Sequence, residues 1–330
     1  MHDLPSPDDL SRFSDFKILT ATYKTVSNHG IKTYVLIPKR LLAPPATPAA
    51  PSPVILRYHG GGFITGSGLY PGFFQPWHME LAARHSAVIV SPDYRLAPEA
   101  SIDDILEDVE DHWTWLRTQL PAFVQTETGG HVSVDAGRVL TAGDSAGGYL
   151  SLVTGLSHSD EIRASVAAYP CMDMADPVFR QVPDAPVPGS DPSDRNAMGE
   201  HLERIRKGDV PPVLSEDPKI ERGGLMFAAQ PFGLFSRLFP FEKRHLFPFE
   251  NLRDGARFPR GGVFVWHGDE DSIVPVRGSV ALEKLVKELD PELPFRLTVR
   301  PGDHVFDFDA KIDDEWMAEG LAGLVKAWLE

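Results

Sequence analysis

The residues of this chain best suited to chemistry are a serine, a histidine and nearby aspartates, each just past the end of a predicted strand. Ser145 lies in residues 143–148 (GDSAGG), between an apolar run and a helical run. Glycines on both sides let a strand and a helix approach closely, and the turn holds the serine at positive φ with its hydroxyl at the helix N-terminus. Such a hydroxyl becomes a nucleophile when a neighbouring base removes its proton. The pattern predicts a catalytic serine, although a glycine-rich turn with an incidental serine has the same spacing.

A base and an acid are expected after two later strands. His304 follows one predicted strand and is the candidate general base. Asp269 and Asp271 both follow another, and either could hold the imidazole in the correct tautomer. Asp303 is a weaker candidate, since neighbours in sequence rarely face each other productively. Serine, aspartate and histidine, in this order and each at the carboxyl end of a strand, would meet at one edge of a parallel sheet.

A third group of donors is expected in residues 59–62 (HGGG), which follow the predicted strand 53–58. Three consecutive glycines leave backbone N–H groups uncovered, so a substrate oxygen can approach them closely. We expect the N–H groups of Gly61 and Gly62, with that of Ala146 after the serine, to form an oxyanion hole.

Three stretches together resemble a known family. Residues 59–62, 93–99 (DYRLAPE) and 143–148 are similar to motifs of the α/β-hydrolase family, in its hormone-sensitive-lipase-like and arylacetamide-deacetylase-like esterase branch, which includes fungal members. The resemblance covers about residues 50–170 and resumes from about 260–330. It implies an α/β-hydrolase fold.

The resemblance also implies how the site residues divide the work. The catalytic triad would be Ser145, Asp271 and His304, with Asp271 preferred over Asp269 because residues 272–275 (SIVP) follow it, the usual setting of the acid in similar hydrolases. The implied activity is that of a serine carboxylesterase, which acts through an acyl-enzyme on esters of short to medium acyl chains or on a secondary-metabolite ester. Exposed edge strands of such proteins often pair, so a homodimer is also predicted.

Two other functions fit the same residues. The site could carry out non-hydrolytic chemistry, either dehydratase or lyase chemistry or the cyclisation of a polyketide-like ester or thioester, because a fold does not fix a reaction. The chain could instead be a catalytically inactive ligand receptor, like the gibberellin-receptor relatives. A receptor would be expected to have lost a triad member, and all three are present here.

The elements that must position these residues alternate along the chain. Two alternating runs, 16–26 and 31–37, predict a hairpin, and strand and helix patterns then alternate from residue 53 onward. This order predicts a single α/β domain over 1–330, with a mostly parallel central sheet and helices on both faces. The segment of about 173–257 interrupts the alternation with prolines and phenylalanines. We expect it to form a helical cap over the site, to which residues 1–15 could also contribute.

Composition limits the partners and the compartment. The net charge of −15 argues against nucleic acid and anionic membrane surfaces, which need clustered Lys and Arg. No stretch is long and apolar enough to predict a membrane span, and the N-terminus lacks a signal-type pattern. The single cysteine, Cys171, fits a reducing compartment, so a cytoplasmic location is expected.

Metal and cofactor chemistry find no support in the motifs. The chain has no His-Glu-x-x-His run and no cysteine pair, and its glycine-rich loops lack the lysine of a phosphate-binding loop. We therefore expect neither a metal nor a cofactor, and a small-molecule ester as the partner.

Overall fold

The computed structural model describes residues 6–43, 50–181 and 194–330. Within them, eight strands form one sheet in the order β1-β2-β4-β3-β5-β6-β7-β8. Their bounds are β1 Phe16–Val26, β2 His29–Pro38, β3 Ser52–Tyr58, β4 Val88–Pro92, β5 Val134–Gly143, β6 Ala164–Ala168, β7 Val263–Gly268 and β8 Phe295–Arg300. The β1–β2 hairpin and the β2–β4 pair are antiparallel, and all pairs from β4 to β8 are parallel. The predicted α/β fold with a mostly parallel sheet is confirmed.

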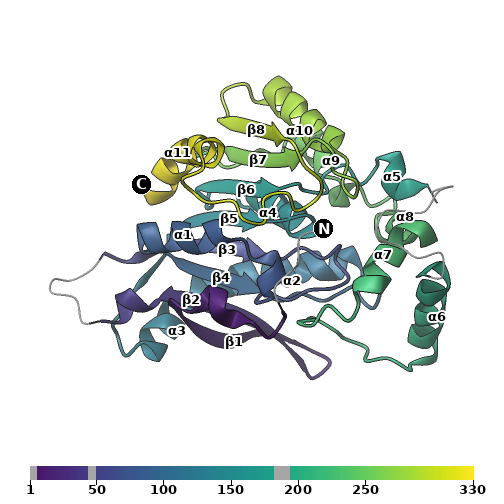
Figure 1. Cartoon of the computed structure of the whole chain (residues 1–330), viewed down its shortest axis with the longest axis horizontal. Helices are drawn as coiled ribbons and strands as arrows, with labels where there is room; N and C mark the ends of the chain where they lie inside the picture. Colours follow the sequence, from purple (N-terminus) through teal and green to yellow (C-terminus); the bar gives the residue numbers. More distant parts are fainter. Residues whose placement is uncertain (1–5, 44–49, 182–193) are drawn as a thin grey trace.

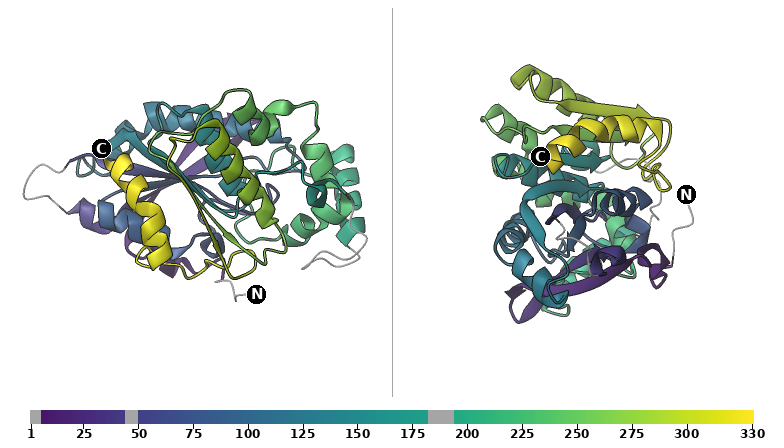
Figure 2. Two further views of the ribbon diagram at one scale, coloured as in Figure 1. Left: turned by 90° about the horizontal axis from the view of Figure 1, so that it is seen from above. Right: turned by 90° about the vertical axis from the view of Figure 1, so that its left-hand side faces the viewer.

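Helices cover both faces of this sheet (Figures 1 and 2). Their bounds are α1 Pro76–His85, α2 Ile102–Thr118, α3 Leu120–Glu127, α4 Ala146–Ser157, α5 Pro177–Arg180, α6 Asp194–Lys207, α7 Gly223–Phe232, α8 Leu234–Leu238, α9 Pro248–Arg253, α10 Val276–Leu289 and α11 Glu315–Leu329. Short 3-10 helices are η1 Leu10–Phe13, η2 Lys39–Leu42, η3 Pro71–Phe73 and η4 Arg244–Leu246.

The strands are apolar on both faces because alternate side chains enter two different cores. In β3, Val54 and Leu56 belong to the core that α2, α4 and α10 cover, whereas Ile55 belongs to the core under α1 and α11. All three side chains are fully buried. Continuous apolar runs, instead of alternation, are therefore what mark the central strands in the sequence.

The segment between β6 and β7, residues 173–257, is called the insertion below; its residues 182–193 lie outside the described part of the chain. It contains α5 to α9, and Figure 1 shows α5 to α8 gathered beyond one end of the strands, at the right. Phe239 of the insertion is fully buried, with its ring centroid 5.7 Å from those of Phe63 and Tyr149. The aromatic side chain thus joins the insertion to the sheet domain.

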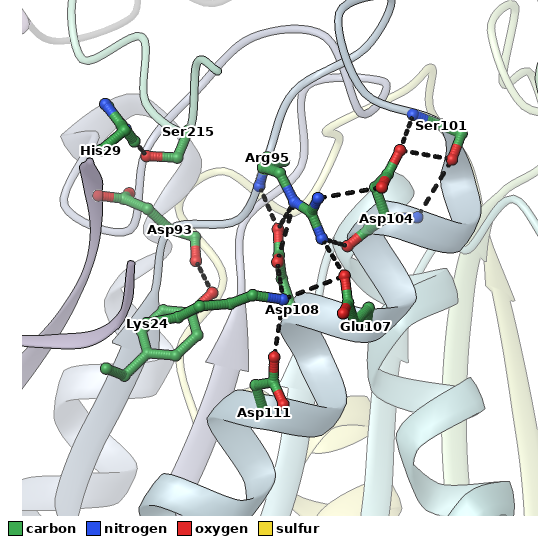
Figure 3. Close-up of polar contacts among 11 residues, drawn as sticks. Lys24, His29, Asp93, Arg95, Ser101, Asp104, Glu107, Asp108, Asp111 and Ser215 are labelled. Carbon is green, nitrogen blue, oxygen red and sulfur yellow. Dashed lines mark hydrogen bonds and ion pairs between the residues drawn. The ribbon is translucent and has the colours of Figure 1, made fainter. Parts of the chain in front are cut away.

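Charged side chains fix the loop that follows β4 (Figure 3). Arg95 of this loop and Lys24 of β1 both bind the buried carboxylate of Asp108 in α2, at 2.8 Å each. Arg95 also binds Asp104 and Glu107, at 3.0 and 2.6 Å. A buried carboxylate needs such partners, and this one thereby joins the hairpin, the loop and α2.

The N-terminal segment lies on the other side of the sheet from the insertion's main contacts. Phe13 of η1 packs edge to face on Phe74 with ring centroids 5.0 Å apart, and the Arg12 guanidinium lies over the Phe308 ring. Residues 1–5 of the predicted cap contribution lie outside the described residues. In the described parts of the chain, we find no helix with the length and apolar character that crossing a membrane requires.

Candidate active site

Ser145 lies at the turn between β5 and α4, with φ 55° and ψ −117°. At Gly147 the turn passes so close to β3 that a Cβ would collide with the carbonyl oxygen of Tyr58, and this position therefore requires glycine. The Ser145 N–H donates to the carbonyl of Ala168 at the end of β6, at 2.9 Å. The strained backbone therefore holds a 9% exposed serine at the head of a helix.

Asp271 and His304 are brought together from the loops after β7 and β8. Nδ1 of His304 lies 2.7 Å from Oδ2 of Asp271, whose side chain is fully buried. The other carboxylate oxygen accepts the N–H groups of Ile273 and Val274, and Nε2 of His267 lies 3.2 Å from Oδ2. Burial raises the pKa of the Asp271 carboxyl, but hydrogen bonds from His267 and His304 outweigh it and hold that pKa well below its usual range. The acid is therefore ionised beside the imidazole.

The other two candidate acids accept hydrogen bonds from backbone N–H groups. Asp269 is exposed, and its Oδ1 accepts a backbone N–H from the turn before His304, at 3.1 Å. Asp303 accepts the N–H and hydroxyl of Ser272 and the N–H of His304, all within 2.8 Å. Among the described residues, the carboxylate paired with the His304 ring is that of Asp271. Asp303 instead ties the histidine loop to the loop that carries the acid.

The three predicted oxyanion donors lie in strained or terminal backbone. Gly61 and Gly62 follow β3 with φ of +98° and +62°. Neither amide donates a hydrogen bond within residues 6–43, 50–181 and 194–330. Ala146 is the first residue of α4, where the N–H has no acceptor within the helix. No backbone acceptor within the described residues therefore occupies any of the three predicted donors.

The glycine loop is anchored by buried side chains beneath it. The ring of His59 stacks on Tyr94 at 4.2 Å, and the Tyr94 hydroxyl donates to the His59 carbonyl. Burial lowers the pKa of His59 to about 3, so the ring is neutral. Asp144 pairs with the buried Arg57 at 2.8 Å, and a Cβ at Gly60 would collide with its carboxylate. These contacts hold the glycine loop in place.

Two residues next to the imidazole were not expected from the sequence. Tyr169, directly after Ala168, packs its ring against His304, and its hydroxyl donates to Asp307 at 2.9 Å. Asp307 also accepts Nε1 of Trp266 at 2.8 Å, and burial raises the pKa of its carboxyl. The available signal was an aspartate between two phenylalanines, three residues after the histidine.

Cys171 is the third unexpected neighbour. It is buried, and its N–H donates to the carbonyl of Ser145 at 3.4 Å. Burial raises the pKa of its thiol to about 12, which the Ser145 hydroxyl only partly offsets. The thiol is therefore protonated and packs beside the serine.

Within the described ranges, no group of three or more His, Cys, Asp or Glu side chains is arranged to hold a metal ion.

Sequence comparison shows which known proteins this chain resembles. The profile of the alpha/beta hydrolase fold matches residues 55–196. A probable carboxylesterase of Phoma sp. is 28% identical over 96% of this chain and 98% of its own length. A probable carboxylesterase of Cochliobolus lunatus is 30% identical over 57% of this chain and 86% of its own length.

Two further similarities bear on fold and chemistry. The crystal structure of an esterase from Pyrobaculum calidifontis superposes with a TM-score of 0.59 at 21% identity, covering 97% of this chain and 88% of that one. A non-reducing polyketide synthase of Preussia isomera is 26% identical over 94% of this chain, which corresponds to 14% of the synthase. The chain is thus similar both to free-standing proteins of its own length and to one segment of a much larger one.

Proposed function

The chain belongs to the α/β-hydrolase fold family and is a carboxylesterase-type hydrolase, and from this premise we propose that it cleaves small-molecule carboxylic esters through an acyl-enzyme on Ser145. The observation that carries the proposal is the 2.7 Å contact between His304 Nδ1 and Asp271 Oδ2. Because Nδ1–H donates to an ionised carboxylate, Nε2 is the ring atom that accepts a proton.

The proposed steps use these residues in turn. Nε2 of His304 takes the proton of the Ser145 hydroxyl as its oxygen bonds to the ester carbonyl carbon, and the carbonyl oxygen becomes an anion. The N–H groups of Gly61, Gly62 and Ala146 stabilise that anion, each donor contributing about 10²–10³-fold in rate. The imidazolium then protonates the departing alkoxide. Water, deprotonated by the same Nε2, cleaves the acyl-enzyme and restores the serine.

The insertion supports a preference for small substrates. We propose that it acts as a cap, because its α7 lies against the glycine loop and its aromatic residues join the core beside α4. A cap over the site would limit the length of the acyl chain that enters, so esters of short to medium acyl chain are the proposed class. The cytoplasmic location, the homodimer and the exclusion of nucleic acid stay predictions from the sequence.

Release or cyclisation of a thioester is the second candidate function. It is favoured by the similarity of almost the whole chain to a segment of a non-reducing polyketide synthase. Attack by Ser145 on a thioester would form the same acyl-enzyme, and an internal hydroxyl of the acyl group could replace water in the second step.

The test compares p-nitrophenyl acetate, butyrate, octanoate and palmitate with an N-acetylcysteamine thioester, using Ser145→Ala as the control. Turnover that depends on Ser145 and peaks at a short acyl chain is the expected result. No ester turnover, with Ser145 still labelled by a fluorophosphonate, would overturn the proposal in favour of the thioester reaction.

A further inference from the structure

We propose that Met226 of the insertion determines which acyl groups fit beside the oxyanion glycines, and that the Arg222–Glu99 ion pair holds it there. This inference rests on the proposed ester hydrolysis at Ser145 and names the part of the substrate that the site selects. Substituents on the carbon next to the carbonyl are the part that Met226 would exclude.

Arg222, immediately before α7, binds the loop after β4 from the insertion side. Its NH1 and NH2 groups donate to the two carboxylate oxygens of Glu99, at 2.9 and 2.7 Å. NH2 also donates to the carbonyl of Ala97, and Nε donates to the carbonyl of Ile64, at 2.7 and 2.8 Å. Ile64 lies two residues after Gly62, so one guanidinium joins the insertion to the glycine loop after β3 and to the loop after β4.

Glu99 binds this guanidinium with a buried, ionised carboxylate. Its side chain is 4% exposed, and its carboxylate also lies 2.8 Å from Nε2 of His201 in α6. Burial would raise the pKa of Glu99, but its hydrogen bond and charge interaction with Arg222 lower it, so the carboxylate is ionised. Removing one partner of such a pair leaves a buried charge uncompensated, and this makes the docking geometry specific.

Asp217 provides a second connection between the start of α7 and the segment after the glycine loop. Its Oδ2 accepts the Thr65 hydroxyl at 2.6 Å and the N–H of Arg222 at 2.8 Å. The N–H of Asp217 donates to the carbonyl of Gly66 at 2.7 Å. Three hydrogen bonds of Asp217 therefore join the start of α7 to the segment that directly follows the glycine loop.

Met226 lies one turn further along α7, where its N–H donates to the Arg222 carbonyl. A Cβ built on Gly62 would lie 3.0 Å from Cγ and 3.6 Å from Sδ of Met226, and these are its contacts within 4 Å. The thioether side chain therefore covers the Gly62 backbone from which an oxyanion donor is proposed. If a carbonyl oxygen binds to the Gly62 N–H, the proposal places its α-carbon, one bond beyond the carbonyl carbon, against this side chain.

The test measures kcat/KM for p-nitrophenyl pivalate, which is branched at the α-carbon, relative to p-nitrophenyl acetate. We expect Met226→Ala to raise this ratio about tenfold, the usual scale for a few methyl groups in a pocket. The matched control is Leu225→Ala, which removes apolar volume from the same helix without a contact to the Gly62 position. An unchanged ratio in Met226→Ala would overturn the proposal.

The role of Arg222 is tested by the same ratio. Arg222→Met is expected to shift the pivalate preference in the same direction as Met226→Ala, with no further shift in the double variant. Arg206→Met is the control, because Arg206 pairs with Glu203 on the exposed face of α6. A fall in activity of Arg222→Met with an unchanged ratio would refute the positioning role; if that variant does not fold, Glu99→Gln tests the same link. Wild-type protein without Ser145-dependent ester turnover would refute the proposed function instead.

Discussion

The rings of Tyr169 and His304 meet edge to face, with centroids 4.5 Å apart and an interplanar angle of 62°. Tyr169 is fixed at both ends, since its N–H donates to the Trp266 carbonyl at 2.7 Å and its hydroxyl donates to Asp307 at 2.9 Å. The imidazole therefore has a hydrogen bond to Asp271 along one edge and a rigid aromatic ring beside it. Together these two contacts restrict the plane in which His304 can present Nε2.

Tyr169 variants should separate packing from hydrogen bonding. Tyr169→Leu removes the ring from His304, and we expect kcat to fall about 10- to 100-fold, because small misplacements of a catalytic group have effects of this size. Tyr169→Phe keeps the ring but leaves Asp307 with one donor fewer, which should lower the free energy of unfolding by about 1–3 kcal/mol with a much smaller change in kcat.

Both Tyr169 variants would be followed by p-nitrophenyl butyrate hydrolysis and by urea denaturation. Equal kcat values for Tyr169→Leu and the wild type would show that the ring does not position His304.

Loss of the nucleophile or base should abolish most turnover. Ser145→Ala and His304→Ala are each expected to lower kcat about 10⁴-fold or more, because such residues act as a unit. His245→Ala is the control for a histidine substitution, since His245 is exposed and pairs with Asp103 of α2, which is none of the proposed site residues. Circular dichroism would verify folding, and near-wild-type turnover in either variant would contradict the mechanism.

The two neighbouring acids should differ sharply. Asp271→Asn disturbs the only carboxylate paired with the His304 ring in the described part of the chain, so kcat should fall about 10⁴-fold, as expected when the imidazole tautomer is no longer fixed. Asp269→Asn alters an exposed acceptor of one backbone N–H and should change kcat only a few-fold. A larger loss at Asp269 than at Asp271 would show that the catalytic acid has been misassigned.

Much of this arrangement is readable from the sequence because it is local. The positive φ of Ser145 agrees with the glycines around it. The strands that precede Ser145 and Asp271 appear as short apolar runs, and the strand that precedes His304 appears as an alternating one. Parallel strands bring their carboxyl ends to one edge, so the order of the motifs predicts their meeting. The choice of Asp271 over Asp269 depended on resemblance, and only the Asp271–His304 contact supplies a physical reason for it.

The contacts that the sequence alone does not predict join residues far apart in the chain. Tyr169 and Asp307 are separated by 138 positions, and Arg222 and Glu99 by 123. Neither pair has a periodicity or motif, because each arises only when the insertion or the last loop packs on the sheet. The contact of Met226 with the Gly62 backbone belongs to the same class, since a phenylalanine-rich segment does not reveal which apolar side chain faces the site.

The pH dependence of stability should carry a contribution from Asp93. Burial raises the pKa of this carboxyl from 3.8 to about 8, with the Gly68 N–H opposing and the Glu216 charge adding to the rise. The native state therefore keeps a proton that the unfolded chain releases above pH 3.8. The resulting stabilisation is present in full below the pKa that Asp93 has in the unfolded chain. It is lost as the pH rises to about 8, by up to about 1.4 kcal/mol per pH unit.

Asp93→Asn should remove this slope and keep the local hydrogen bonds. Oδ1 accepts the Gly68 N–H at 2.8 Å and Oδ2 lies 3.1 Å from the Tyr34 hydroxyl, which can in turn donate to Glu216 at 3.2 Å. An amide satisfies both positions without a charge. The free energy of unfolding of Asp93→Asn minus that of the wild type should therefore grow as pH rises and become constant above about pH 8.

The difference would be measured by urea denaturation between pH 5 and pH 9, about the range that the two ends of the titration require. Asp160→Asn is the matched control at an exposed aspartate and should give a flat difference. A flat difference for Asp93→Asn as well would mean that Asp93 is ionised in the native protein, and that the Gly68 and Tyr34 donors are sufficient to hold a buried carboxylate there.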